Sequence, residues 1–184
     1  MKIQNSGKGF TLVESLVAVS ILLIAVVAPM SIIGGSLAQV STARDQMTAV
    51  NLAQEGIEAV RQKRDSNMLD KWITVGSTTV WDAGLATGVD AYLVDSATVT
   101  PLVSCGGVCT AAQKIIYQDQ ATRLYHQYVS SPVGSAKPFS RAVTIADIVA
   151  GREKKITSTV TWKTSNGVTK TIAVSESIFA ENNP

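Results

Sequence analysis

The sequence is poor in the residues that usually carry catalysis or nucleic-acid recognition. Its 184 residues include one histidine, His126, and two cysteines. No Ser-His-Asp arrangement, phosphate-binding loop or carboxylate pair stands out, so we expect no enzyme and no cofactor. Nucleic-acid binding calls for a basic patch with interleaved aromatics. The formal net charge is +2 and aromatics make up 5% of the chain, so no nucleic-acid contact is expected.

Charge is absent from Ser15 to Ile33, a run of 19 residues. As a helix, this run would rise about 1.5 Å per residue, or roughly 28 Å, close to the hydrocarbon thickness of a bilayer. We therefore predict one transmembrane helix here, and no second run of this kind follows. Lys2 and Lys8 precede the run, and the next cation is Arg44. This bias predicts a cytoplasmic N-terminus, with the remainder of the chain on the other side of the membrane.

The order of the N-terminal features differs from that of a secretory signal peptide, which places a small-residue cleavage site after its apolar region. Here the small residue, Gly9, comes before the apolar run. A cut between Gly9 and Phe10 would leave the apolar segment on the mature protein. Glu14 would then be the fifth mature residue. A carboxylate near the start of a membrane span is costly, so its presence needs a reason.

The order of a basic leader, Gly9, the segment Phe10–Glu14 and an apolar span resembles the prepilin processing site of type IV pilins and type II secretion pseudopilins. The resemblance implies that prepilin peptidase removes the leader and that Phe10 is N-methylated. It also implies that Glu14 attracts the N-terminal amine of a neighbouring subunit and sets the register of assembly. The alternative is an ordinary N-terminal anchor that is never cut.

The same resemblance implies a type IV pilin-like α+β fold, with a long N-terminal helix packed on a small antiparallel sheet. The segments would be a leader (1–9), a transmembrane and filament-core helix (10–35), an amphipathic helix (36–64) and a β-rich extracytoplasmic domain (65–184). The expected partners are other pilins or pseudopilins, prepilin peptidase with its N-methyltransferase activity, the inner-membrane assembly platform and membrane lipid. The protein would begin as a single-pass inner-membrane protein and then join a cell-surface or periplasmic filament.

Pro29 is expected to kink the long helix, because proline removes one hydrogen bond and clashes with the preceding turn. Gly34 and Gly35 follow, and the resemblance implies that the chain bends or melts in this region. Beyond them, apolar residues recur at steps of three and four, which predicts an amphipathic helix that seats the globular domain. Gly56 interrupts this helix at a cost of about 1 kcal/mol relative to alanine. The predicted apolar stripe consists of Leu37, Val40, Ala43, Met47, Val50, Ala53, Ile57 and Val60.

The middle of the chain, residues 65–138, is predicted to be mainly loop with short strands. Trp72–Val75 and Thr78–Trp81 flank Gly76-Ser77, which predicts a hairpin. The C-terminal third has clearer strand patterns at Phe139–Ile145, Lys155–Lys163 and Thr169–Ile178. The turn Asn166-Gly167 joins the last two as a hairpin. Phe139, Val143, Ile145, Ile156, Val160, Trp162, Ile172, Val174 and Ile178 supply the apolar positions of these strands. Three antiparallel strands laid against the helix would bury its apolar stripe.

Cys105 and Cys109 are separated by three residues, two of them glycines that can bend a short loop. A disulfide is the preferred interpretation, and free thiols or a metal site are the alternatives. A zinc site would normally need four ligands at tighter spacing, so no metal is expected. Asp65, Asn67 and Asp70 resemble a calcium loop only loosely, because its glycine and terminal glutamate are missing. His126 is interpreted as an ordinary strand or loop residue.

The segment Ala53–Arg61, together with Asp65-Ser66-Asn67, resembles PilV-like minor pilins and I-type pseudopilins. The expected function is therefore that of a minor type IV pilin, which assembles into a pilus or at its tip. A type II secretion pseudopilin is the first alternative. An uncut, membrane-tethered binding domain or adhesin is the second. The same helix serves pili, secretion and DNA uptake, so the sequence does not choose among these machines.

Overall fold

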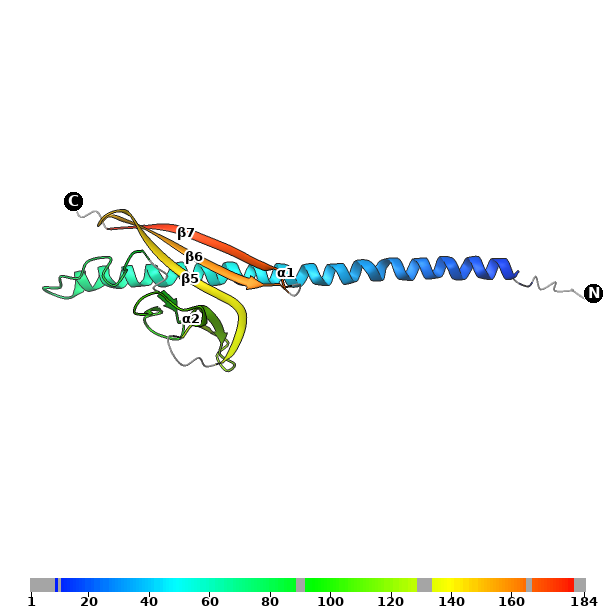
Figure 1. The fold of residues 1–184 in the computed structure, drawn as a ribbon, viewed down its shortest axis with the longest axis horizontal. Coiled ribbons are helices and arrows are strands. Elements are labelled where there is room, and N and C mark those ends of the chain that lie inside the picture. Colours follow the sequence, from blue (N-terminus) through cyan, green and yellow to red (C-terminus); the bar gives the residue numbers. More distant parts are fainter. Residues whose placement is uncertain (1–8, 10, 89–91, 129–133, 165–166, 181–184) are drawn as a thin grey trace, which may run out of the picture. The chain divides into compact units, whose positions relative to one another are not determined.

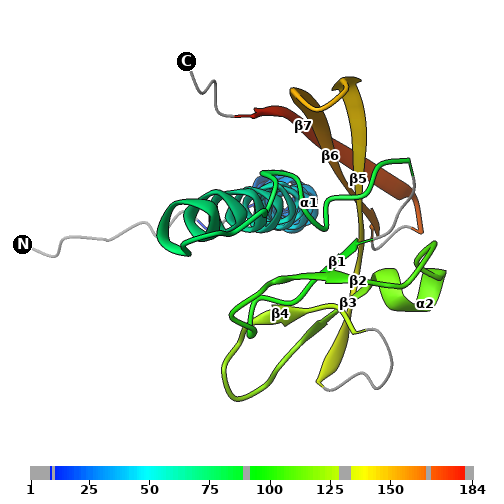
Figure 2. The same cartoon turned by 90° about the vertical axis from the view of Figure 1, so that its left-hand side faces the viewer.

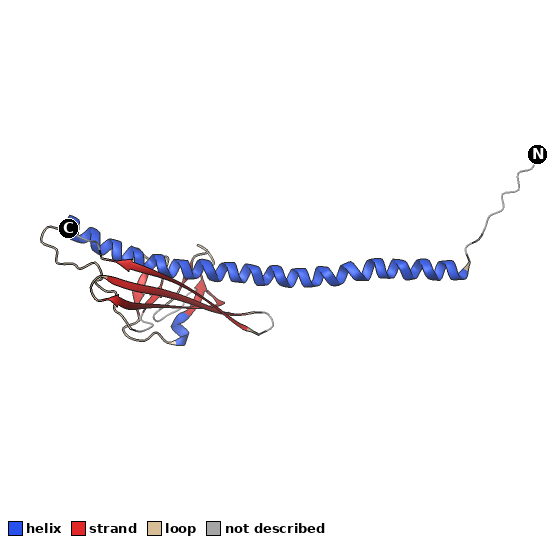
Figure 3. Cartoon of the chain, turned by 90° about the horizontal axis from the view of Figure 1, so that it is seen from above, coloured by secondary structure: helices blue, strands red, loops and turns tan. Residues whose placement is uncertain are grey.

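The protein has an α+β architecture, in which a long N-terminal helix precedes an antiparallel sheet (Figures 1 and 3). This confirms the predicted fold class. Helix α1 (Leu12–Ile73) belongs to both compact units of the chain, residues 1–44 and residues 45–184. The computed structural model describes residues 9, 11–88, 92–128, 134–164 and 167–180, without the side chains of 28, 31, 32, 34, 35, 37 and 38.

In the first unit, α1 is helical through Pro29 and also through Gly34 and Gly35. The chain therefore does not melt in this region, whereas a bend there stays a prediction. Backbone hydrogen bonding along a helix can continue past a single proline, since only one donor is lost there. The predicted kink at Pro29 stays a prediction.

In the second unit, α1 ends at Ile73, nine residues beyond the predicted end at residue 64. The predicted hairpin around Gly76-Ser77 is therefore wrong, because Trp72 and Ile73 are helical and Val75 is 102% exposed. The physical reason is tertiary. The buried amide of Asn67 donates hydrogen bonds to the carbonyl oxygens of Trp81 (3.1 Å) and Ala83 (2.8 Å). These bonds hold the following loop against the last turns of the helix.

Among the described residues, all strand pairs are antiparallel and belong to one seven-stranded sheet. The central strand, β5, pairs with β6 along one edge and with β1 and β3 along the other, while β2 and β4 extend the sheet beyond β1 and β3. Strand β7 pairs with β6. The strands are β1 (Tyr92–Val94), β2 (Leu102–Ser104), β3 (Ile115–Gln118), β4 (Tyr125–His126), β5 (Ser135–Val149), β6 (Glu153–Lys163) and β7 (Thr169–Phe179), and a short helix α2 (Ala111–Lys114) precedes β3. Strands β1 to β4 lie in the middle region, which the sequence predicts to be mainly loop with short strands.

The predicted inward positions of the C-terminal strands form the core. Buried side chains of β5 and β6 alternate with half-buried or exposed ones, as expected for a sheet with one face on the core. The register places Phe139 opposite Trp162 and Ile145 opposite Ile156, and all four are buried. In β7, Ile178 is buried and the other two apolar positions are half-buried. The predicted turn residue Asn166 lies outside the described residues.

The second part of α1 packs on one face of strands β5, β6 and β7 (Figure 2). The prediction of a continuous apolar stripe is wrong at its beginning, since Val40 is 58% exposed and Met47 is 68% exposed. Among the described residues, Ala49 is the first helix residue in the hydrophobic core that α1 forms with the sheet. The side chain of Leu37 lies outside the described residues. The buried face consists of Ala49, Leu52, Ala53, Gly56, Ile57, Ala59 and Val60.

Gly56 lies on the buried face of α1, in close contact with strands β5 and β6. A Cβ atom placed on Gly56 would lie 2.4 Å from Ser158 Oγ and 3.1 Å from Val143 Cγ2. At these distances a methyl group would fit only if the neighbouring atoms moved. The glycine that weakens the helix locally therefore permits its close approach to β5 and β6.

Candidate functional site

The N-terminal segment contains the residues that sequence analysis singled out for processing. Gly9 and Thr11 precede α1, whereas Phe10 lies outside the described residues. A Cβ atom placed on Gly9 meets no other atom within 4 Å in the described part of the chain. Nothing in that part therefore requires a glycine at this position. Thr11 caps the helix, because its side-chain Oγ1 accepts a hydrogen bond from the backbone N–H of Glu14 at 3.2 Å.

Glu14 lies exposed in the first turn of α1, three residues after the capping Thr11. This spacing matches the sequence signature of a capping box. An acid in the first turn also interacts favourably with the positive end of the helix dipole. Glu14 is therefore placed to stabilise the start of the helix in addition to the intersubunit role that the resemblance implies.

The apolar side chains along the first unit are exposed in the single chain. They lie on every side of the helix and do not form a single apolar stripe. Exposed apolar surface of this extent indicates contact with lipid or with other apolar helices. The described exposed positions include Leu12, Val13, Leu16, Val17, Val19, Ile21, Leu22, Leu23, Ile24, Val26, Val27, Met30 and Ile33.

Among the residues that the structure describes, no helix meets the length and hydropathy required of a membrane span.

A disulfide joins Cys105 and Cys109, with the two Cα atoms 5.4 Å apart. The loop between them bends at Gly106, whose φ of +74° is in the left-handed region that favours glycine. The bond closes the short loop that links β2 to α2. It lies in the part of the chain that is predicted to be extracytoplasmic, where a disulfide can persist.

Arg141 is a buried cation at the junction of three elements. It lies on β5, is 0% exposed and donates from all three guanidinium nitrogens. Its Nη1 bonds the Leu52 carbonyl oxygen (2.8 Å) and Glu55 Oε2 (2.7 Å) on α1. Its Nη2 bonds the Val94 carbonyl oxygen of β1 at 3.1 Å, and its Nε bonds Gln127 Oε1 at 3.0 Å. Burial lowers the pKa of Arg141, and the charge and hydrogen bond of Glu55 oppose that effect.

Gln127 extends this network, because it is itself buried and uses both ends of its amide. Its Nε2 donates to the carbonyl oxygens of Lys114 (2.8 Å) and Arg141 (2.9 Å). Its Oε1 accepts from the backbone N–H of Val94 at 3.2 Å. The network therefore joins the helix, the central strand and the short strands of the middle region through fully bonded polar groups.

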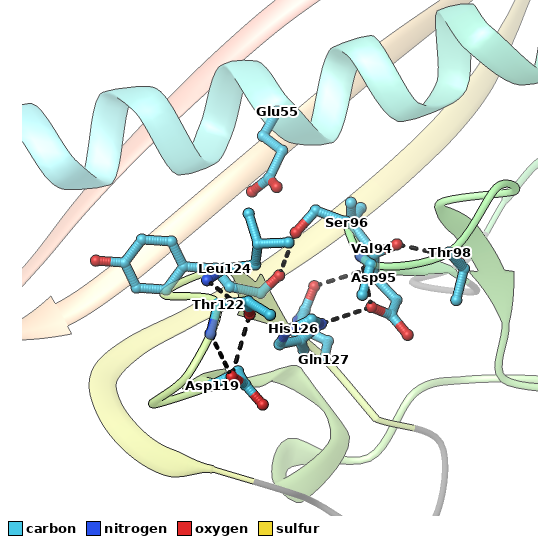
Figure 4. Close-up of polar contacts among 12 residues, drawn as sticks. Glu55, Val94, Asp95, Ser96, Thr98, Asp119, Thr122, Leu124, His126 and Gln127 are labelled. Atoms are coloured by element: carbon cyan, nitrogen blue, oxygen red, sulfur yellow. Dashed lines mark hydrogen bonds and ion pairs between the residues drawn. The ribbon is translucent and has the colours of Figure 1, made fainter.

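His126 lies beside the network on β4 (Figure 4). The side chain is almost fully buried, and its Nδ1 lies 2.7 Å from Asp95 Oδ1. A histidine held by an aspartate is one part of a catalytic triad, which also needs a nucleophile. The neighbouring hydroxyl of Ser96 donates instead to the Tyr125 carbonyl oxygen. The described arrangement therefore joins β4 to the loop after β1 and does not activate that serine.

A groove of about 190 Å³ lies between α1 and the loop after β1. Two carboxylates reach it, but Glu55 already bonds Arg141 and Glu58 already bonds Arg61. These bonds leave the carboxylates in structural ion pairs. The groove is lined by Glu55, Glu58, Ala59, Gln62, Val94, Ser96, Thr98 and Pro101.

The loosely calcium-like residues Asp65, Asn67 and Asp70 lie on helix α1 and do not form a loop. Asn67 bonds backbone carbonyl groups, as described above. Asp70 accepts hydrogen bonds from Thr79 Oγ1 (2.6 Å), Ser77 Oγ (2.8 Å) and Thr74 Oγ1 (2.9 Å). Within the described ranges, no group of three or more potential metal ligands converges.

Sequence analysis did not identify Arg141 as part of the polar network, although its position in the strand carried a usable signal. Arg141 follows the same two-residue alternation as Phe139, Val143 and Ile145, so the pattern itself places its side chain on the inward face. An inward arginine needs partners, which would have marked it as a network residue. No local signal pairs His126 with Asp95, because the two residues are far apart in the sequence.

Comparison with known proteins identifies the N-terminal segment. Residues 5–28 match the family model of the prokaryotic N-terminal methylation motif. The chain therefore carries the prepilin-type signal of type IV pilins and pseudopilins, which confirms the resemblance seen in its sequence. The matched segment includes Gly9, Phe10 and Glu14. No curated protein and no solved structure matches the chain.

Proposed function

We propose that this protein is a minor type IV pilin, a structural subunit that prepilin peptidase processes and that then assembles into a pilus or at its tip. The methylation motif supports a type IV pilin-like or pseudopilin precursor. The exposed apolar side chains of residues 12–33 support a role for this segment in contacts with lipid and with other subunits.

The observation that carries the proposal is the glycine at position 9. It belongs to the matched motif, yet a Cβ atom there would meet nothing in the described chain. Since the described fold gives no reason for a glycine here, we infer that the glycine is required for recognition by the protease. Cleavage after Gly9 would free the amine of Phe10 four residues before Glu14. That amine would be the one new cation next to the carboxylate, and the two could pair between neighbouring subunits.

Before assembly, the uncharged run from Ser15 to Ile33 would hold the protein in the inner membrane. Lys2 and Lys8 would remain in the cytoplasm, as their position before the run predicts. Processing would then remove both lysines with the leader. The globular residues 65–184 would lie outside the cytoplasm and carry the surface that distinguishes this subunit from others.

A type II secretion pseudopilin is the alternative that shares this processing, because the same motif serves both classes. The preference for a minor pilin rests on the resemblance of Ala53–Arg61 to PilV-like minor pilins, although this segment also resembles I-type pseudopilins. An uncut, membrane-tethered binding domain or adhesin would need no glycine at position 9. Processing therefore separates the two filament classes from this last alternative.

The test is processing in cells that express prepilin peptidase. Mass spectrometry of the mature protein is expected to find Phe10 at the N-terminus, with one added methyl group. Gly9→Val should block the cut by crowding the scissile bond. Gly7→Val is the matched control, since it changes a leader glycine away from that bond and should leave cleavage intact. A protein that still begins at Met1 beside an active peptidase would refute the proposal.

A further inference from the structure

Strand β7 forms a long and regular edge of the sheet (Figure 1). Among the described residues it pairs with β6 alone, over all 11 of its residues and without a register shift. It contains no proline, glycine or bulge, which are common means of blocking an edge strand. The edge strands β2 and β4 are only three and two residues long. The edge of β7 is therefore a template for one more strand.

The hydrogen bonds at the two ends of the β6–β7 pair define which backbone groups face the edge. The N–H of Thr164 donates to the Val168 carbonyl oxygen at 2.9 Å, and that of Ala180 donates to the Arg152 carbonyl oxygen at 2.8 Å. Along an antiparallel strand, successive residues direct their backbone N–H and C=O groups alternately toward one neighbouring strand and toward the opposite side. Even-numbered residues of β7 thus direct their N–H and C=O groups toward β6. The odd-numbered residues Thr169, Thr171, Ala173, Ser175, Ser177 and Phe179 direct theirs toward the open edge.

The sequence of β7 is self-complementary when it is read in both directions from Ala173. It reads Thr-Lys-Thr-Ile-Ala-Val-Ser-Glu-Ser from 169 to 177. One residue away from Ala173 on either side are Ile172 and Val174, which are both β-branched. Two residues away are a threonine and a serine, and three residues away are Lys170 and Glu176. The charges at matching positions are opposite in sign.

We propose that β7 pairs antiparallel with β7 of a second copy of this chain, with Ala173 opposite Ala173. In this register the odd-numbered residues face one another and form the hydrogen-bonded pairs. Lys170 of each copy lies opposite Glu176 of the other, and Ile172 lies opposite Val174. These are non-hydrogen-bonded pairs, where cross-strand side chains come closest. Two salt bridges and two apolar pairs therefore select a second copy as the occupant.

The neighbouring registers lack this match. Centring the pair on Val174 places Lys170 opposite Ile178 and Glu176 opposite Ile172. Centring it on Ile172 places Lys170 opposite Val174. Each shift leaves a charge opposite an apolar side chain. The register centred on Ala173 instead pairs every residue from 169 to 177 with one of its own chemical kind or of opposite charge.

The side chains at the edge are compatible with this contact. Ile172 and Val174 pack on the core but remain half-buried, so a second strand would cover more of their apolar surface. Glu176 accepts a hydrogen bond from Arg61 Nε at 2.9 Å, and its carboxylate is still partly exposed. A carboxylate has about four acceptor positions, so Lys170 of the second copy could bind beside Arg61.

The pairing is isologous, because the same residues contribute from both copies. Its two-fold axis reverses the strand direction, so residues 45–73 of the two copies run in opposite directions. The contact therefore joins two copies whose globular units, residues 45–184, point in opposite directions. It is distinct from packing in which subunits share one direction.

Disulfide trapping tests the register directly. Residues opposite one another in a hydrogen-bonded pair have Cα atoms about 5.5 Å apart, within the range of about 4.4–6.8 Å that a disulfide spans. The full chain in mild detergent, carrying Ala173→Cys, is expected to form a covalent dimer at twice the monomer mass on mild oxidation. Thr171→Cys and Ser175→Cys are the matched controls. Each alone should stay monomeric, since like residues would be about 13 Å apart along the strand, and an equal mixture of the two should form the dimer.

The charge pairs give a second test in the Ala173→Cys background. Lys170→Glu places an acid opposite Glu176 at both contacts and should abolish the dimer. Mixing this variant with Glu176→Lys restores attraction at both contacts and should recover it. Circular dichroism establishes that each variant is folded, which is needed because Glu176 also bonds Arg61. Equal trapping at positions 173 and 175, or a dimer unaffected by Lys170→Glu, would overturn the proposal.

Discussion

At the scale of single residues, Arg141 and Gly56 position the helix on the sheet by different means. Arg141 donates hydrogen bonds to Glu55 and to the backbone of α1 and β1, so its charge is compensated inside the core. Gly56 acts by being small, since it lets the helix approach Ser158. Arg141 contributes hydrogen bonds and Gly56 permits close contact. Substitutions of the two residues should therefore lower the stability of the fold for different reasons.

Arg141→Met should lower the free energy of unfolding strongly. It removes the partner of Glu55 and leaves acceptor groups unpaired in a buried place, and breaking such a pair typically costs about 3–5 kcal/mol. The measurement is urea unfolding of the full chain in mild detergent, followed by tryptophan fluorescence. Arg152→Met, at an exposed arginine, is the matched control and should change little. Equal stabilities of the two variants would show that the buried network contributes nothing.

Gly56→Ala should also destabilise the protein, although alanine favours helix by about 1 kcal/mol. Overpacking at a contact of this kind costs about 1–3 kcal/mol, and the 2.4 Å approach to Ser158 Oγ makes that cost the larger of the two effects. Ser158→Ala should recover part of the loss, which a double-mutant cycle measures as coupling. Gly107→Ala is the control, because a Cβ atom there meets nothing within 4 Å in the described chain. Absence of coupling between positions 56 and 158 would contradict this account.

At the scale of elements, the end of helix α1 depends on Asp70. Hydrogen bonds from the hydroxyls of Thr79, Ser77 and Thr74, in that order of effect, lower the pKa of Asp70. They join the last turn of the helix to the loop that follows it. The ionised carboxylate is the form that accepts all of these bonds, so the helix end should depend on pH.

The stability that Asp70 contributes should be lost in acid. Its pKa in the folded state is below the unfolded value of about 3.9, so the contribution is complete above that pH and disappears as the pH falls through the folded pKa. The wild type should therefore be more stable than Asp70→Asn at pH 7, with the difference shrinking below about pH 4. Unfolding in urea at a series of pH values measures this difference in stability. Asp45→Asn is the control for loss of an acid from the same helix. A difference that persists unchanged to pH 2 would rule out ionisation as the cause.

At the scale of the whole molecule, the two compact units differ in what they bury. Residues 45–184 build a core from the helix and the sheet. The described apolar side chains of residues 12–33 are exposed instead, which indicates contact with lipid or with other apolar helices. Glu14 is the one acid in that apolar segment, and its effect should appear when those partners are bound.

Glu14→Val should leave the protein inserted and cleaved but poorly incorporated into filaments. A lone carboxylate is costly in a membrane helix, so the variant should tolerate insertion well. Its loss would remove the partner of the Phe10 amine in a neighbouring subunit. Glu14→Asp should be intermediate because its reach is shorter. Glu14→Gln retains an amide that is able to cap the helix, and it should still be poorly incorporated into filaments. This variant therefore distinguishes the effect of the charge from the effect of helix capping.

The measurement for these variants is the ratio of this protein in sheared filaments to that in membranes. The amount of cleaved protein in each strain serves as the control for processing. An unchanged ratio for Glu14→Val would show that the carboxylate has no part in assembly.

Local patterns in the sequence were sufficient for the N-terminal motif, the α+β class and the three long C-terminal strands. Each depends on residues that are close together in the chain. Gly9 and Glu14 belong to one short segment, and the alternation through Phe139, Val143 and Ile145 is legible within a single strand. These predictions required no knowledge of what the residues contact.

Only the tertiary structure decided the features that depend on distant partners. Helix α1 extends to Ile73 because Asn67 and Asp70 bond a loop that follows it, against the strand-like pattern of the sequence there. His126 contacts Asp95, and Arg141 donates hydrogen bonds to Leu52 and Glu55, although these partners are distant in the sequence. Local propensity is worth a fraction of a kcal/mol per residue, whereas buried polar groups without partners cost more. The long-range contacts therefore prevail wherever the two conflict.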